Sequence, residues 1–97
     1  MNEKFIVGLG NPGNEYRNNR HNIGFLILEH LANKYESKFV LKNKLKSLCS
    51  ELKIDNFTYR LFLPNTFMNK SGDAVKAIVD WYKVDLAQLF IIVDDLD

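Results

Sequence analysis

The sequence has little that would mark a secreted, membrane-spanning or disulfide-linked protein. Its apolar residues never approach the run of roughly 18 that a bilayer span requires, and its start, Met-Asn-Glu-Lys, leads into a short apolar stretch instead of a signal peptide. We therefore expect a cytoplasmic protein with no membrane partner. The single cysteine, Cys49, excludes an internal disulfide, and its alternating surroundings predict a small, half-buried strand residue.

A net charge of either sign is also nearly absent. Thirteen basic and twelve acidic residues leave a formal charge of +1, so bulk electrostatics neither indicates nor excludes a nucleic-acid partner. Any attraction for phosphate has to be local, although most exposed basic side chains are simply solvated. The candidate phosphate contacts are Arg17, Arg20, Lys42, Lys44, Lys46 and Lys70.

The apolar content suffices for one packed domain. The chain has 97 residues, of which 46% are hydrophobic. Its patterns predict a strand at 5–9, a helix from about 22 to 35 and a hairpin of two strands at 45–54 and 57–63. A second helix at 71–83 and a last strand at 89–93 follow. This order predicts an α/β fold, with three α/β/α layers around a mixed, largely parallel central sheet.

Both predicted helices are amphipathic. The apolar stripe of the first comprises Ile23, Ile27, Leu31 and Tyr35, flanked by Leu28 and Ala32. The residues that the second is expected to bury are Ala74, Val75, Ile78, Val79 and Tyr82. Between the helices, Asp55-Asn56 is typical of a hairpin turn, and Pro64 is expected to end the hairpin.

The last predicted strand is wholly apolar, which is typical of a central strand. Because the chain stops at Asp97, directly after it, we expect residues 1–97 to form a single incomplete domain, truncated after a central strand. A central strand left at an edge exposes unpaired backbone groups and apolar surface. One hypothesis is therefore a non-catalytic fragment whose exposed sheet edge self-associates.

Polar residues follow three of the predicted strands. Reactive groups of open α/β sheets collect beyond the carboxyl ends of parallel strands, where loops converge. Residues 10–13, 65–69 and 94–95 occupy such positions, and His21 stands at the entry to the first helix. If the strands are parallel, one imidazole, one carboxylate and two carboxamides can face one cleft.

This combination suits hydrolysis by an activated water. A neutral imidazole accepts a proton from water near neutral pH, and a carboxylate on its other nitrogen fixes the tautomer. Carboxamides hold a carbonyl, a developing oxyanion or the water. Each residue also has an ordinary structural role: His21 and Asn69 could cap helices, Asn11 could serve a turn, and Asp94 could end a strand. Spacing alone leaves both interpretations open.

Two other motifs point elsewhere and are less convincing. The glycines at positions 8, 10 and 13 match a dinucleotide-binding pattern, but Pro12 removes a backbone amide and residues 14–20 have no helical apolar period. The carboxylates at 94, 95 and 97 could ligate Mg²⁺, but no phosphate-cradling loop accompanies them, so we expect no metal. His30 is interpreted as a surface residue of the first helix.

Three ordered blocks resemble the bacterial peptidyl-tRNA hydrolase family. They are Phe-Ile-Val-Gly-Leu-Gly-Asn-Pro-Gly-Asn-Glu-Tyr (5–16) followed by Arg-His-Asn-Ile-Gly (20–24), Pro-Asn-Thr-Phe-Met-Asn-Lys-Ser-Gly (64–72), and Ile-Ile-Val-Asp-Asp-Leu-Asp (91–97). The resemblance implies a cofactor-free esterase that hydrolyses the bond between a peptide and the 3′-terminal adenosine of tRNA. It makes His21 the general base, Asp94 its orienting carboxylate, Asn11 and Asn69 positioning groups, and Tyr16 and Met68 walls of the cleft.

The resemblance also sets an expectation about length. Chains of this family run to roughly twice the present length, and their second half carries a further substrate-binding asparagine and basic residues that grip tRNA. The full-length form is expected to be a monomer that needs no metal. The 97-residue chain holds the chemistry without much of the clamp, so we expect it to be weakly active or inactive alone.

Overall fold

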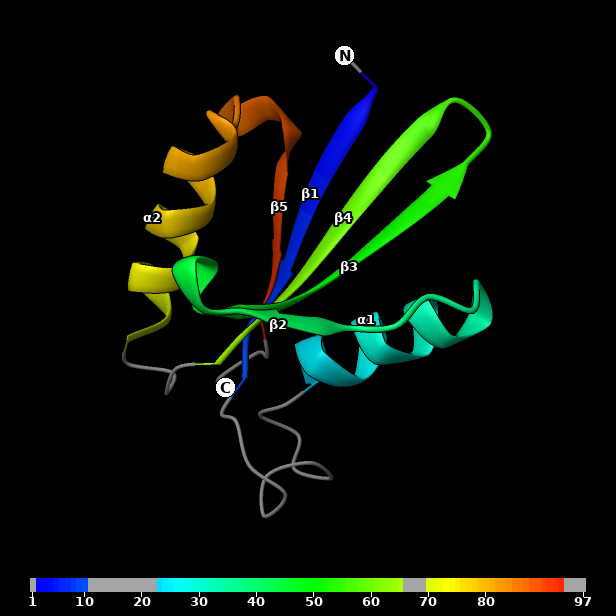
Figure 1. Cartoon of the computed structure of the whole chain (residues 1–97), viewed down its shortest axis with the longest axis horizontal. Coiled ribbons are helices and arrows are strands. Elements are labelled where there is room, and N and C mark those ends of the chain that lie inside the picture. Colours follow the sequence, from blue (N-terminus) through cyan, green and yellow to red (C-terminus); the bar gives the residue numbers. More distant parts are fainter. Residues whose placement is uncertain (1, 11–22, 66–69, 94–97) are drawn as a thin grey trace.

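The structure, a computed structural model, describes residues 2–10, 23–65 and 70–93. A five-stranded sheet carries helices on its faces (Figure 1). In chain order the elements are β1 (Glu3–Gly8), α1 (Ile23–Lys34), β2 (Val40–Lys42), the short 3-10 turn η3 (Asn43–Leu45), β3 (Ser47–Ile54), β4 (Phe57–Pro64), α2 (Ser71–Tyr82), the 3-10 turn η5 (Leu86–Gln88) and β5 (Leu89–Ile92). The α/β class predicted from the sequence is confirmed.

The sheet is mixed, in the order β2-β3-β4-β1-β5. β1 pairs in parallel with both β4 and β5, whereas β2 with β3 and β3 with β4 are antiparallel. The parallel half is therefore β4-β1-β5, with β1 at its centre. The predicted hairpin is confirmed, with Ile54 opposite Phe57 and Asp55 in the left-handed region at φ 56°. The short strand β2 was not predicted.

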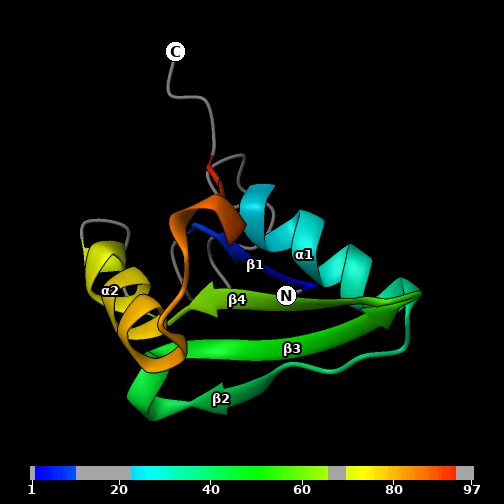
Figure 2. The same cartoon turned by 90° about the horizontal axis from the view of Figure 1, so that it is seen from above.

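The two helices cover opposite faces of the sheet (Figures 1 and 2). Side chains of successive strand residues alternate between these faces, so each helix packs on its own apolar cluster. On the α2 face the buried cluster consists of Phe5, Val7, Leu45, Cys49, Phe62 and Ile78. On the α1 face it consists of Leu28, Ala32, Leu52, Leu61 and Leu63. The predicted three layers are confirmed. Cys49 was predicted to be half-buried, but it is 8% exposed and belongs to the buried cluster, because α2 covers this face of the sheet.

The buried side of α1 differs from the predicted stripe. Ile23 and Ile27 are 42% and 43% exposed, while the fully buried residues of the helix are Gly24, Leu28 and Ala32. The helix is thus turned by about one residue, because Gly24 has no side chain and lets the start of the helix approach the sheet backbone closely. In α2 the predicted face is confirmed, with Ala74 and Ile78 fully buried.

β5 lies at one edge of the described sheet, next to β1. Apolar residues on both faces of the strand are partly exposed: Phe90 is 49% and Ile91 46% exposed, and Val93 beyond the strand is 52% exposed. The predicted apolar strand is therefore confirmed. Within the described residues it pairs with β1 on one side, and no strand pairs with its other side. Neither helix of the described part of the chain is long and apolar enough to cross a membrane.

Candidate active site at the carboxyl edge of the parallel strands

Three parallel strands end together at one edge of the sheet. Val7 of β1 is opposite Phe62 of β4, and Gly8 of β1 is opposite Ile92 of β5. The segments that follow β1, β4 and β5 therefore leave the sheet from the same edge, as the sequence-based argument required. Such an edge is where α/β proteins gather ligand-binding and catalytic groups.

The start of α1 is fixed at this same edge by contact between backbones. A Cβ at Gly24 would lie 2.8 Å from the backbone N of Leu9, the backbone O of Leu9 and the backbone O of Ile92. A Cβ at Gly8 would lie 2.6 Å from the Gly24 carbonyl oxygen. The Leu9 amide also donates a hydrogen bond to the Ile92 carbonyl over 2.9 Å. Two glycines thus hold α1, β1 and β5 together within a few ångströms.

Sequence reasoning quoted Gly24 only as part of a motif and missed this positioning role. The available signal was a glycine in the first turn of an otherwise apolar helix. Glycine lowers the stability of a helix, so its presence there indicates a position where close packing leaves no room for a side chain.

The predicted site residues themselves lie outside the described residues. These are Asn11, Tyr16, His21, Met68, Asn69 and Asp94, together with the candidate phosphate contacts Arg17 and Arg20. What the structure describes are the residues to which they are joined: Gly10, Ile23, Asn65, Lys70 and Val93. Their assignments therefore remain predictions.

The described part of the edge also includes the turn between β2 and β3. The backbone N–H of Asn65, directly after β4, donates to the Lys46 carbonyl over 2.7 Å. Lys46 has a left-handed backbone, with φ 52°. This bond ties the lysine-rich turn around η3 to the point where the second motif leaves the sheet.

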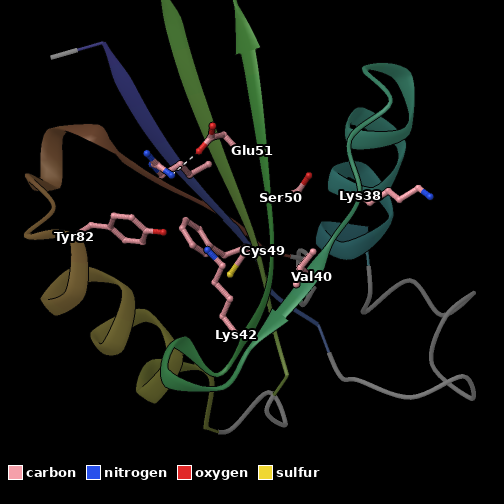
Figure 3. Close-up of a pocket in the computed structure, with 9 residues that line it drawn as sticks. Lys38, Val40, Lys42, Cys49, Ser50, Glu51 and Tyr82 are labelled. Atoms are coloured by element: carbon pink, nitrogen blue, oxygen red, sulfur yellow. Dashed lines mark hydrogen bonds and ion pairs between the residues drawn. The ribbon is translucent and has the colours of Figure 1, made fainter.

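A cavity of about 270 Å³ opens on the α2 face (Figure 3). It lies over the middle of the sheet, beside the end of α2. Its lining consists of Lys38, Val40, Lys42, Cys49, Ser50, Glu51, Arg60, Phe62 and Tyr82. Lys42 points into it, whereas Lys38 points away to solvent.

Arg60 forms the charged end of that cavity. It makes ion pairs of 3.0 Å with Glu3 and 2.7 Å with Glu51, and its guanidinium lies 5.1 Å from the centre of the Tyr82 ring. Partial burial works to lower the pKa of Arg60, but the hydrogen bond that Arg60 donates to Glu3 and the nearby charge of Glu51 outweigh it, so the pKa is raised. Arg60 is therefore a fixed cation already neutralised by its neighbours.

Cys49 lines the cavity and is 8% exposed. Burial raises the pKa of the thiol above its ordinary value, and the nearby charge of Lys42 offsets this only in part. A nucleophilic cysteine needs a lowered pKa, so the raised pKa of Cys49 favours a structural residue.

In residues 2–10, 23–65 and 70–93 no group of three His, Cys, Asp or Glu side chains lies close enough together to hold a metal ion. The carboxylates at 94, 95 and 97 lie outside these ranges.

The fold and this edge define an α/β protein with its candidate site at the carboxyl ends of β4, β1 and β5. Comparison with known proteins gives the family. The peptidyl-tRNA hydrolase family matches residues 5–97, and the chain belongs to that family.

Relatives agree across the whole chain. It is 76% identical to a peptidyl-tRNA hydrolase of Prochlorococcus marinus subsp. pastoris over 96 residues, covering 99% of this chain and 47% of that one. It is 45% identical to the peptidyl-tRNA hydrolase of a Synechococcus species over 94 residues, covering 97% and 45%. The crystal structure of peptidyl-tRNA hydrolase from Acinetobacter baumannii matches with a TM-score of 0.91 at 40% identity, covering 99% of this chain and 49% of that one. The chain thus spans about half the length of the relatives it matches.

Proposed function

We propose that this chain carries the catalytic half of an esterase that hydrolyses the bond between a peptide, or another N-blocked aminoacyl group, and the 3′-terminal adenosine of tRNA. The observation that supports the proposal most is the joint ending of β4, β1 and β5 at one edge, with the start of α1 packed against it. The products are free tRNA and the peptide carboxylate.

The backbone contacts at Gly24 favour a shared cleft for the proposed general base, His21, and its proposed partner, Asp94. His21 is three residues before Gly24, and Asp94 is two residues after Ile92. The backbones of Gly24 and Ile92 are in contact at this edge. Since consecutive Cα atoms are about 3.8 Å apart, the chain allows the imidazole and the carboxylate to meet without any change in the sheet.

In the proposed mechanism His21 acts as general base. Its neutral imidazole takes a proton from water, and the water oxygen attacks the ester carbonyl carbon. Asp94 accepts a hydrogen bond from the other imidazole N–H and stabilises the imidazolium that forms. When the tetrahedral intermediate collapses, the ribose oxygen leaves and takes the proton from the imidazolium, so the base is regenerated.

The carboxamides of Asn11 and Asn69 supply the remaining polar contacts. Their N–H groups donate to the ester carbonyl oxygen as negative charge develops on it, and their oxygens accept from the water or the peptide. Tyr16 and Met68 form apolar walls of the cleft. An ester has a good leaving group, so these few donors and one base suffice without a cofactor.

The test is hydrolysis of N-acetyl-aminoacyl-tRNA by this chain alone and by a chimeric protein. In the chimera, residues 1–97 replace the matching half of the Prochlorococcus relative, with which they share 76% identity. We expect the chimera to be active and His21→Ala to lower its rate by about 10²–10⁴-fold, the usual contribution of a general base. The matched control is His30→Ala, an exposed residue of α1. An inactive chimera, or equal losses in the two histidine variants, would overturn the proposal.

A second candidate function, self-association of a non-catalytic chain, is favoured by the open edge of β5. Phe90, Ile91 and Val93 expose apolar surface there, and an unpaired strand edge is a template for another strand. Sedimentation at micromolar concentration tests this alternative. A dimer that dissociates in Ile91→Lys, together with no hydrolysis by the chimera, would favour it over the enzyme.

A further inference from the structure

The single tryptophan of the chain is an exposed residue of α2. Trp81 is 56% exposed, and the ammonium group of Lys44 lies 4.3 Å from the centre of its ring. Large aromatic side chains are usually buried because they contribute so much apolar surface, so an open indole beside a cation is an informative exception. α2 and η3 lie side by side in both views (Figures 1 and 2).

The segment that supplies Lys44 is strongly basic although the whole chain is nearly neutral. Residues 37–50 contain four lysines and no acidic residue. Lys42, Lys44 and Lys46 are all exposed, and no carboxylate within the described residues pairs with them. We call Lys42, Lys44, Lys46 and Trp81 the basic patch. Its charge is available for an external anion.

The acidic groups near the patch have other partners. Asp80, next to Trp81 in α2, accepts a 2.8 Å hydrogen bond from Lys76. Glu51, which lines the neighbouring cavity, is paired with Arg60 at 2.7 Å. The local positive potential is therefore not cancelled by these two carboxylates.

The patch borders the candidate active site on one side and the cavity on the other. Lys46 accepts the hydrogen bond from Asn65, which directly follows β4 at the carboxyl edge. Lys42 points into the cavity, whose wall includes the rings of Phe62 and Tyr82 (Figure 3). A polyanion with planar bases, lying across the patch, would lead directly to the edge where the ester is expected.

We propose that the basic patch is a binding surface for tRNA, in which the three lysines contact backbone phosphates and the exposed ring of Trp81 stacks on a base. The inference rests on the proposed function and names a contact surface for its substrate outside the catalytic cleft. Lysines around an exposed aromatic ring are the combination that single-stranded nucleic acid binds, because the charge follows the backbone while the ring accepts any base.

Trp81 itself provides the measurement, since it is the sole tryptophan. Unacylated tRNA, which carries no ester, is added to the 97-residue chain, and Trp81 emission is followed at several salt concentrations. We expect quenching that saturates and weakens as salt rises. Polyglutamate, an acidic polymer without bases, should leave the emission unchanged. Unchanged emission with tRNA, or equal quenching by polyglutamate, would overturn the proposal.

Variants locate the contact. Lys44→Gln should reduce the slope of log affinity against log salt by about 1, the loss expected for one phosphate contact. Lys34→Gln is the matched control, because Lys34 also lies over an exposed ring, 5.8 Å from the centre of Tyr35, but belongs to α1 on the other face of the sheet. With 5′-labelled tRNA, Trp81→Ala should weaken binding roughly five- to a hundredfold. Equal slopes in the two lysine variants, or unchanged affinity in Trp81→Ala, would contradict the assignment.

These outcomes are separable from those of the catalytic proposal. Binding of unacylated tRNA does not depend on His21. If the chimera fails to hydrolyse its substrate while Trp81 emission still changes with tRNA, the proposed function is contradicted and the proposed binding surface is supported. If the chimera hydrolyses its substrate while Trp81 emission does not change with tRNA, the proposed function is supported and the proposed binding surface is contradicted.

Discussion

The two faces of the sheet are packed by different means. On the α1 face the helix touches the sheet backbone through Gly24, and the buried residues of the cluster around Leu28 and Leu61 are all aliphatic. On the α2 face three aromatic rings, Phe5, Phe62 and Tyr82, meet with centroids 5.3–6.3 Å apart, beside an open cavity. Backbone contact fixes the start of α1 within a narrow range, whereas side-chain packing leaves space beside α2.

This difference matches what each face is expected to do. α1 begins two residues after His21, and this is the helix held by backbone contact. The proposed role of His21 as general base requires such fixed geometry. The helix that carries Trp81 is on the face with the cavity and the lysines, where a ligand needs accessible surface.

The strongest test of the comparison is Gly24→Ala. The added Cβ would meet three backbone atoms at 2.8 Å, none of which can rotate away, so we expect a loss of about 3–4 kcal/mol, at or above the usual range for overpacking. Urea unfolding measures it. The control is Gly72→Ala in α2, where nothing lies within 4 Å and the better helix former should add about 0.5 kcal/mol. Similar changes in both variants would mean that α1 is not held by this contact.

A second test compares truncations on the two faces. Leu61→Ala removes a fully buried side chain from the α1 face and should cost about 3 kcal/mol in free energy of unfolding. Cys49→Ala removes a smaller group that already lines the cavity of the α2 face, so we expect about 1 kcal/mol. If Cys49→Ala proves as costly as Leu61→Ala, the α2 face is as tightly packed as its counterpart.

The charged end of the cavity should contribute less. Arg60→Met keeps the aliphatic packing but breaks the ion pairs to Glu3 and Glu51, and its side chain is only 26% exposed, so we expect a loss of about 1 kcal/mol. The loss should shrink in 1 M salt because screening weakens exposed ion pairs. Lys53→Met, whose ammonium is 3.8 Å from Glu51 and 74% exposed, should have no measurable effect. A loss unaffected by salt would assign the role of Arg60 to its packing on Tyr82.

The smallest expected effect is a pH dependence from Cys49. Folding raises the pKa of this thiol above its ordinary value of 9.0, so the unfolded chain loses the proton first as pH increases. The contribution to stability is therefore complete below that value and falls as pH rises through the folded pKa. Urea unfolding from pH 7 to 10 should show this fall in the wild type and not in Cys49→Ala. In Lys42→Met the fall should be steeper, because the charge of Lys42 lowers the thiol pKa.

The strands, helices and layers could be predicted because each follows from a local apolar pattern or a turn. The buried side of α1 could not, since Ile23 and Ile27 are apolar by pattern yet 42% and 43% exposed. Their position depends on the contact of Gly24 with Leu9 and Ile92, which are distant in sequence. Likewise, the three blocks predict which residues belong to the site, but the meeting of β1 with β5 is a tertiary fact.

The pairing of Lys44 with Trp81 was also beyond sequence reasoning. The lysines were identified as candidate phosphate contacts, but nothing in their spacing indicates that a tryptophan 37 positions later stands beneath one of them. That contact arises from the packing of η3 on α2 through Leu45 and Ile78.

The central place of β1 has a cost during synthesis. Its partners on either side are β4, where Phe5 faces Arg60, and β5, where Phe5 faces Leu89, so β1 is completed by a strand that lies more than 80 residues later in the chain. At a translation rate of about 5–20 residues per second, β1 would wait on the order of ten seconds for β5 to leave the ribosome. Until then β1 can pair only with β4, which is made earlier, and its side facing β5 stays open. Pairing between strands so distant in sequence slows folding.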